Sequence, residues 1–181
     1  MDFQILYAIQ NMRTPAFDSF ILWLTNFVGG YGQLWIVVGI VMCTFKRARK
    51  AGIAVLLSWV MVYLVNQCGL KELIARVRPC NIDTSIDMLV KAPSSYSCPS
   101  THSAWALAGA MSIFMFHRKR GIPVIIFSLL ICFSRLYLFV HFPTDVLLGA
   151  VIGALLGILC YLIVKGAYKA IEKQKSGNTE I

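Results

Sequence analysis

The sequence has little charge for its length. Only 14% of its 181 residues are charged, whereas 58% are hydrophobic. In an average globular domain about a quarter of the residues are charged, so this composition indicates a protein embedded in a membrane. The length is that of a single domain, residues 1–181. The sequence also lacks internal repeats and low-complexity tracts. Its N-terminus has neither a basic segment nor a small-residue cleavage site, so we expect no cleaved signal peptide.

The basic residues are unevenly placed along the chain. Of the 17 Lys and Arg, most fall in clusters at the ends of apolar runs: Arg13; Lys46, Arg47, Arg49 and Lys50; Arg118, Lys119 and Arg120; Lys165, Lys169, Lys173 and Lys175. These clusters would all lie on one side of a membrane, as the positive-inside rule requires. The pattern argues against a nucleic-acid partner and places both termini, with the tail 166–181, in the cytoplasm.

The apolar runs predict an all-α fold, a polytopic membrane helix bundle of about six transmembrane helices with an N-terminal interfacial helix at residues 2–12. The expected crossings are residues 16–28, 33–45, 51–70, 100–116, 122–139 and 146–164. Because a crossing needs about 20 residues, the first run either spans or lies flat in the interface. Residues 71–99 form a long polar connection on the outer face, and such connections are usually functional.

This topology brings three polar motifs to the same outer face. They are Lys71 with Arg78-Pro79; Cys98-Pro99-Ser100-Thr101-His102; and Ser134-Arg135 with His141 and Asp145. Lys71, Arg78 and Arg135 would surround one point with three cations, which suits a phosphate group. Ser100 precedes an apolar helix and fits an N-cap, so the following amides would form an anion site.

Two histidines in this setting suggest a division of work. One would attack phosphorus and the other would protonate the leaving oxygen. Asp145 lies four residues after His141, where a carboxylate can fix the tautomer of the imidazole. No cluster of carboxylates or cysteines accompanies the pair, so we expect no magnesium or zinc ion.

Taken singly, these residues also have ordinary explanations. Lys71 can snorkel at a helix end, Arg78 can be a juxtamembrane charge, and Asp145 in a first helical turn favours the helix dipole. Only the joint spacing favours a site. Arg76 and Lys91 fall outside the pattern and are interpreted as solvated loop charges, and His117 as an interfacial residue of the inner turn.

Together the motifs resemble those of the type 2 phosphatidic acid phosphatases, which share their site architecture with vanadium haloperoxidases. The family pattern is Lys-x6-Arg-Pro, Pro-Ser-Gly-His and Ser-Arg-x5-His-x3-Asp. Here it reads Lys71…Arg78-Pro79, Pro99-Ser100-Thr101-His102 and Ser134-Arg135…His141…Asp145. The resemblance covers about residues 50–165, and three spaced motifs are far more specific than one. The departure is Thr101, where the family usually has glycine.

The resemblance implies a role for each residue. His141 would be the nucleophile that forms a phosphohistidine, oriented by Asp145, and His102 the general acid and later the base. Lys71, Arg78, Ser100, Arg135 and the Thr101 amide would hold the phosphoryl oxygens. The chain would then be a membrane phosphatase that needs no metal or cofactor, acts on a lipid phosphate in the bilayer, and has no obligate protein partner.

The sequence indicates the type of reaction more clearly than it indicates the substrate. Undecaprenyl pyrophosphate is our first expectation, with phosphatidylglycerol phosphate and phosphatidic acid as alternatives. The site would face the outside of the plasma membrane. The alternative from a different functional class is a non-catalytic membrane protein that binds phospholipid and keeps the family fold.

Two of the six cysteines lie in the outer connection, beside the motifs. Cys80 follows Arg78-Pro79, and Cys98 precedes Pro99. Because the outer compartment is oxidising in many organisms, we predict a disulfide between them, with two free thiols as the alternative.

Overall fold

The chain is all-helical in the computed structural model, which describes residues 1–177. Its helices are α1 (Asp2–Gln10), α2 (Pro15–Val28), α3 (Gln33–Thr44), α4 (Arg49–Val62), the π-helix η1 (Tyr63–Leu70), α5 (Lys71–Ile74), α6 (Pro79–Ile82), α7 (Thr101–Phe116), α8 (Arg118–Tyr137) and α9 (Pro143–Gly177). The all-α bundle with a short N-terminal helix is therefore confirmed.

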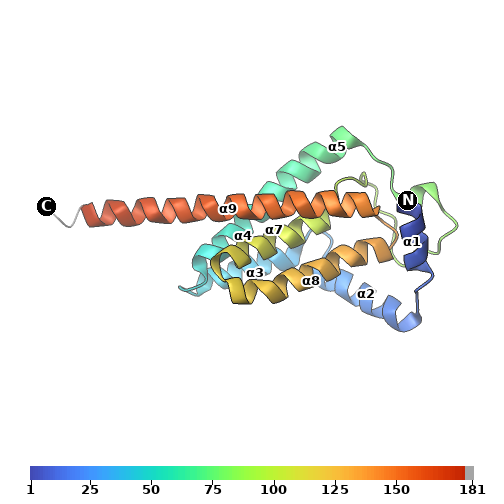
Figure 1. Ribbon diagram of the computed structural model, residues 1–181, viewed down its shortest axis with the longest axis horizontal. Helices are drawn as coiled ribbons and strands as arrows, with labels where there is room; N and C mark the ends of the chain where they lie inside the picture. Colours follow the sequence, from blue (N-terminus) through green and yellow to red (C-terminus); the bar gives the residue numbers. More distant parts are fainter. Residues whose placement is uncertain (178–181) are drawn as a thin grey trace.

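The centre of the bundle is α7, which packs against α4, α8 and α9 (Figure 1). Its sequence is rich in alanine, serine and glycine, and small side chains allow neighbouring helix backbones to approach closely. Most of its residues are buried, including Ala104, Ala106, Ala108 and Ala110, which have no exposed surface.

Fewer helices than expected are long enough to cross a membrane. Three helical runs in the described chain meet the length and composition of a span: residues 49–82, 118–137 and 143–175. A fourth arises if α2 and α3, which are bent by 53° at a short break, count as one. The short run 16–28 forms α2, which has only 14 residues. The expected crossing at 100–116 corresponds to α7, which has 16 residues.

The outer connection begins later than predicted, because the helix continues through Lys71 to Ile74. Ala75 then adopts the left-handed conformation (φ 48°), and its N–H donates to the carbonyl of Lys71 at 2.9 Å. A left-handed residue is a common way to end a helix. The chain turns back at this point, which carries Arg76 and Arg78 across the end of the bundle.

The beginnings of α7 and α9 meet at one end of the bundle. Helix α9 starts at Pro143, as predicted, since proline fits a first helical position. The Ser100 N–H, at the start of α7, donates to the carbonyl of Asp145 at 3.0 Å. Figure 1 shows α1 across this end, whereas the α3–α4 and α7–α8 turns lie at the opposite end.

Candidate active site

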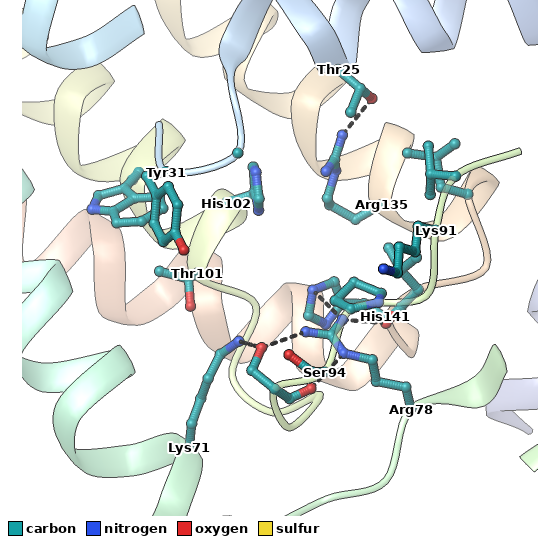
Figure 2. A pocket seen from close by; sticks show the side chains of 17 residues that line it. Thr25, Tyr31, Lys71, Arg78, Lys91, Ser94, Thr101, His102, Arg135 and His141 are labelled. Atoms are coloured by element: carbon teal, nitrogen blue, oxygen red, sulfur yellow. Dashed lines mark hydrogen bonds between the residues drawn. The ribbon is translucent and has the colours of Figure 1, made fainter. Parts of the chain in front are cut away.

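A cavity of about 440 Å³ opens at the end of the bundle where α7 and α9 begin. Six of the predicted site residues line it: Lys71, Arg78, Thr101, His102, Arg135 and His141. Figure 2 shows these side chains converging on the cavity from different elements, although the first and last are 70 residues apart in sequence. The structure therefore brings together members of all three motifs.

His141 lies between the cavity and the interior, and its ring contacts a cation on one side and a carboxylate on the other. Its Nε2 is 3.2 Å from Arg78 Nη1, and its Nδ1 is 3.4 Å from Ser97 Oγ and 4.0 Å from Asp145 Oδ2. A guanidinium can only donate, so Nε2 must be the unprotonated nitrogen and Nδ1 must carry the hydrogen. That tautomer presents a lone pair beside the cavity.

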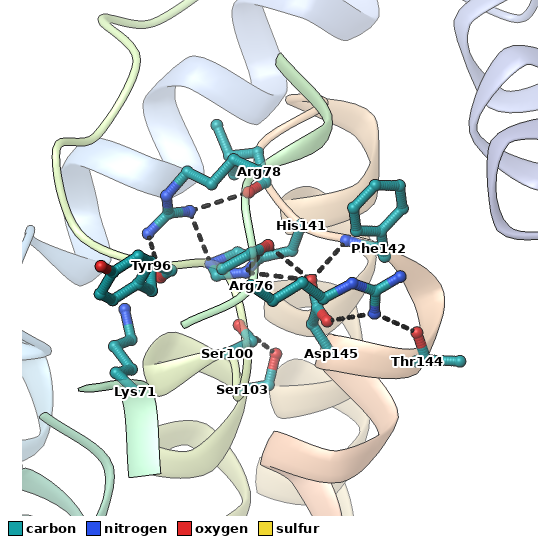
Figure 3. Close-up of polar contacts among 12 residues, drawn as sticks. Lys71, Arg76, Arg78, Tyr96, Ser100, Ser103, His141, Phe142, Thr144 and Asp145 are labelled. Carbon is teal, nitrogen blue, oxygen red and sulfur yellow. Dashed lines mark hydrogen bonds and ion pairs between the residues drawn. The ribbon is translucent and has the colours of Figure 1, made fainter. Parts of the chain in front are cut away.

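Asp145 is fully buried behind this histidine, and its two oxygens have different partners. Oδ2 accepts from Ser97 Oγ at 2.5 Å and from the Phe142 N–H at 3.0 Å. Oδ1 accepts from Arg76 Nη1 at 2.6 Å. The carboxylate is thus held on both sides, with Oδ2 turned toward His141 (Figure 3).

Lys71 and Arg78 are buried cations, and Ser95 of the outer connection contacts both of them. Arg78 donates to the carbonyls of Ser95 (2.7 Å), Tyr96 (3.1 Å) and Val140 (2.8 Å). Ser95 Oγ also accepts from Arg78 Nη2 at 3.1 Å and from Lys71 Nζ at 3.3 Å. One hydroxyl therefore separates the two like charges and fixes both beside the cavity.

Arg135 and His102 lie on the opposite wall from this pair (Figure 2). Arg135 donates to Thr25 Oγ1 at 2.6 Å and to Ser134 Oγ at 3.0 Å. His102 Nε2 is 3.3 Å from the carbonyl of Gly29. These contacts come from α2 and the turn after it, so the N-terminal part of the chain completes the wall.

Ser100 and Thr101 differ in their relation to the cavity. Ser100 is fully buried, precedes the first residue of α7, and makes no side-chain cap; its Oγ accepts from Ser103 Oγ at 3.0 Å. Thr101 lines the cavity. The N-cap position of Ser100 is confirmed, whereas its contact with a phosphoryl oxygen remains a prediction.

Sequence reasoning missed several polar residues at the site. Ser95, Ser97 and Thr25 hold the cations and the carboxylate, but single hydroxyls carry no spacing signal that would distinguish them. Arg76 was interpreted as a solvated loop charge, and this was wrong: it pairs with Asp145. Lys91 is exposed and lines the cavity. Nothing in the sequence indicated this position, because Lys91 is not part of any of the three motifs.

The predicted disulfide between Cys80 and Cys98 is absent, because both are free, buried thiols. Cys80 packs in an apolar cluster with Leu6, Phe139 and Phe142. Burial and the neighbouring Asp145 carboxylate raise the pKa of the Cys98 thiol to about 11. Little of the thiolate that disulfide formation requires is then present at neutral pH.

Comparisons with known proteins agree with this arrangement. Residues 51–169 match the PAP2 superfamily. An undecaprenyl-diphosphatase of Sulfolobus acidocaldarius is 33% identical over 154 residues, which cover 83% of this chain and 74% of that protein. The crystal structure of a PAP2-type phosphatidylglycerolphosphate phosphatase from Bacillus subtilis has a TM-score of 0.68 and 29% identity, covering 94% of this chain and 85% of the other. That of Aquifex aeolicus LpxE has a TM-score of 0.71 and 25% identity, covering 88% and 93%.

Proposed function

The chain belongs to the PAP2 superfamily, and we propose that it hydrolyses a lipid phosphate through a phosphohistidine at His141, without a metal ion. The observation that carries the proposal is the lone pair of His141 Nε2, which faces Arg78 Nη1 at 3.2 Å beside a cavity that Lys71 and Arg135 also line. Fixed cations around a nucleophile neutralise the charge of a transferring phosphoryl group.

The proposed reaction has two steps. Nε2 of His141 attacks phosphorus as the bond to the leaving oxygen breaks, and His102 donates a proton to that oxygen. Water then attacks the phosphohistidine, with His102 accepting its proton, which releases phosphate and restores the imidazole. Metal independence follows from the donor set, because the described cavity wall carries cations and no carboxylate.

Among lipid phosphates, undecaprenyl pyrophosphate is the substrate that we propose first. The 33% identity to an undecaprenyl-diphosphatase supports it, and so does Lys91, a further cation that projects into the cavity (Figure 2). A diphosphate presents more anionic oxygens than a monoester and has use for an additional cation. Phosphatidylglycerol phosphate is the second candidate, because the Bacillus subtilis phosphatase with that specificity is 29% identical.

The chain is a multi-pass membrane protein, and we place its cavity on the outer face of the plasma membrane. The support is the distribution of charge: the basic α3–α4 and α7–α8 turns lie at the end of the bundle opposite the cavity. Positively charged turns favour the cytoplasm. The C-terminus would then be cytoplasmic. The N-terminus would not, because α1 lies across the cavity end, where Asp2 binds Arg76 and Arg13 binds the carbonyl of Asp87 in the outer connection. With this orientation, the prediction that both termini and the Arg13 charge are cytoplasmic holds only for the C-terminus.

Phosphate release by detergent-purified protein tests the activity. Undecaprenyl pyrophosphate, phosphatidylglycerol phosphate and phosphatidic acid would be compared in excess chelator, with His141→Ala and the matched control His117→Ala, which changes a histidine of the inner turn. We expect chelator-resistant release that His141→Ala abolishes and His117→Ala retains. Release that requires added metal would overturn metal independence, and no release from any lipid would favour a non-catalytic binding protein.

The variant Lys91→Gln tests the proposed preference for a diphosphate over a monophosphate. Because a hydrogen bond to a charged group contributes about 1.5–3 kcal/mol, we expect kcat/KM for the diphosphate to fall by about tenfold or more. Monophosphate turnover should change much less, and Lys119→Gln, in the inner turn, should change neither. Equal losses on mono- and diphosphate would assign Lys91 to general attraction of anions.

A further inference from the structure

Arg76 joins the buried catalytic carboxylate to the N-terminal helix. Its Nη1 donates to Asp145 Oδ1 at 2.6 Å and to Thr144 Oγ1 at 2.7 Å. Its Nη2 donates to Asp2 Oδ2 at 2.9 Å. The guanidinium also lies 4.0 Å from the centre of the Phe142 ring. Arg76 therefore bridges α1 and the start of α9, and Figure 3 shows it on the side of Asp145 away from Lys71.

The carboxylate that Arg76 contacts has no exposure to solvent. A buried charge is stable only when it is paired and hydrogen-bonded. Arg76 pairs with Oδ1, which leaves Oδ2 for Ser97, the Phe142 amide and Nδ1 of His141. A rotation of the carboxylate would change the distance of 4.0 Å between Oδ2 and Nδ1.

Asp2 holds the other side of Arg76. Its Oδ2 also accepts from Thr144 Oγ1 at 2.8 Å, so Asp2, Thr144 and Arg76 form a closed triangle of hydrogen bonds. Although burial alone raises the pKa of Asp2, the hydrogen bonds from Arg76 and Thr144 lower it overall. Phe3 continues the contact, since its ring meets Phe142 edge-on at 5.2 Å. Helix α1 is thus fastened to the segment between His141 and Asp145.

We infer that Asp2 and Arg76 form a positioning relay that sets the orientation of Asp145, and through it the reactivity of His141. The inference rests on the proposed phosphohistidine mechanism. Neither residue lines the cavity, so the relay acts on the chemical step and not on phosphate binding. Asp2 also lies outside the region that matches the family, residues 51–169, so α1 contributes to the site from beyond that region.

The test compares Arg76→Gln, Arg76→Lys and Asp2→Asn, each with a C-terminal tag that leaves Asp2 undisturbed. Because a misplacement of about 1 Å can reduce a rate by about 100-fold, we expect Arg76→Gln to lower kcat at least tenfold with KM nearly unchanged. Arg76→Lys retains a positive charge and should recover part of the rate. Asp2→Asn keeps the shape but weakens the ion pair, and should lower kcat by a few fold.

The matched control is Arg13→Gln. Arg13 also anchors the N-terminal segment, through Asp18 at 3.2 Å and the carbonyl of Asp87 at 2.8 Å, but it has no contact with Asp145 among those that the structure shows. A loss of rate from Arg13→Gln equal to that from Asp2→Asn would assign α1 a general structural role. An unchanged kcat in Arg76→Gln, or a rise in KM alone, would overturn the relay.

One measurement separates the proposed function from the relay: the rate at which radiolabelled phosphate from the substrate appears on His141. No labelling of the wild-type chain would contradict the proposed function itself. Wild-type labelling with equal rates in the Arg76 variants would contradict the relay alone. Arg76→Lys and Asp2→Asn keep the inference testable if Arg76→Gln does not fold.

Discussion

Each motif cation in the cavity wall is already bound to a hydroxyl before any substrate arrives. Lys71 and Arg78 share Ser95, and Arg135 is held by Thr25 and Ser134. A site whose dipoles and charges are fixed in advance needs no reorganisation when charge develops on the phosphoryl group. The serine and threonine side chains therefore determine the geometry of the cation cluster that the motifs supply.

The protonation of His141 gives a testable prediction. Burial, followed by the charges of Arg78 and Lys71, lowers the pKa of His141 well below its ordinary value of 6.5. We expect the imidazole to remain neutral, and hence nucleophilic, at pH 6 in the absence of substrate. NMR titration of ring-labelled histidine in detergent micelles would measure this, with the resonance assigned by its loss in His141→Ala.

The lowered pKa of His141 also determines how this residue affects stability as the pH changes. The unfolded chain takes up this proton near pH 6.5 and the folded chain does not, so the unfolded state binds more protons below that pH. The contribution of His141 to the free energy of unfolding therefore decreases as pH falls below about 6.5. A midpoint for His141 at or above 6.5 would contradict the low pKa and the neutral nucleophile.

At the scale of residues, the sequence predicted which side chains meet but not what holds them. Lys71, Arg78 and His141 converge as expected, because motif spacing and topology together determine their place. Arg76 was misjudged because its importance comes from Asp2 and Asp145, which are distant in sequence. The disulfide failed for a related reason: both cysteines neighbour motifs along the chain, but their side chains have different surroundings.

Among the elements, α7 and α9 hold the site together through a row of small residues. Gly149, Gly153 and Gly157 recur every four residues and so share one face of α9. A Cβ added to each would lie within 2.5 Å of a backbone oxygen of α7 or of its N-cap, namely those of Ser100, Ala104 and Ala108. The close approach aligns the starts of both helices, where His102 and Asp145 lie.

We predict that Gly153→Ala disturbs this alignment. Its new Cβ would lie 2.2 Å from the carbonyl oxygen of Ala104, and such overpacking costs about 1–3 kcal/mol. The melting temperature in detergent should fall, and kcat should fall as α7 shifts relative to α9. The control is Gly166→Ala in the same helix, which meets nothing within 4 Å and should gain up to about 1 kcal/mol from helix propensity. Equal behaviour of the two variants would show that the helix contact is loose.

Helix ends were predictable where a residue's own chemistry determines them. Pro143 begins α9 as expected, since its ring fits only a first turn. The continuation of the helix through Lys71 was missed, because its end depends on the left-handed Ala75 (φ 48°), and alanine gives no signal for that conformation. The predicted crossing at residues 100–116 corresponds closely to α7, whose 16 residues are fewer than the 18 used to identify a span by length and composition.

At the scale of the whole molecule, charge and chemistry lie at opposite ends of the bundle. Helix α9 extends past the other helices at the end away from the cavity (Figure 1). The last third of α9 carries the lysines of the tail, from Lys165 to Lys175. Because such charges favour the cytoplasm, an orientation with the tail inside places the cavity at the outer surface.

This orientation predicts a difference between two kinds of membrane preparation. With an epitope tag at the C-terminus, trypsin should remove the tag at Lys173 or Lys175 in inside-out vesicles. Intact cells or spheroplasts, which expose the outer face, should keep it. A C-terminal tag cleaved from the outside would reverse the topology and place the cavity in the cytoplasm. Substrate lipids would then reach His141 from the inner leaflet, and an undecaprenyl pyrophosphate released at the outer surface would no longer be a suitable substrate.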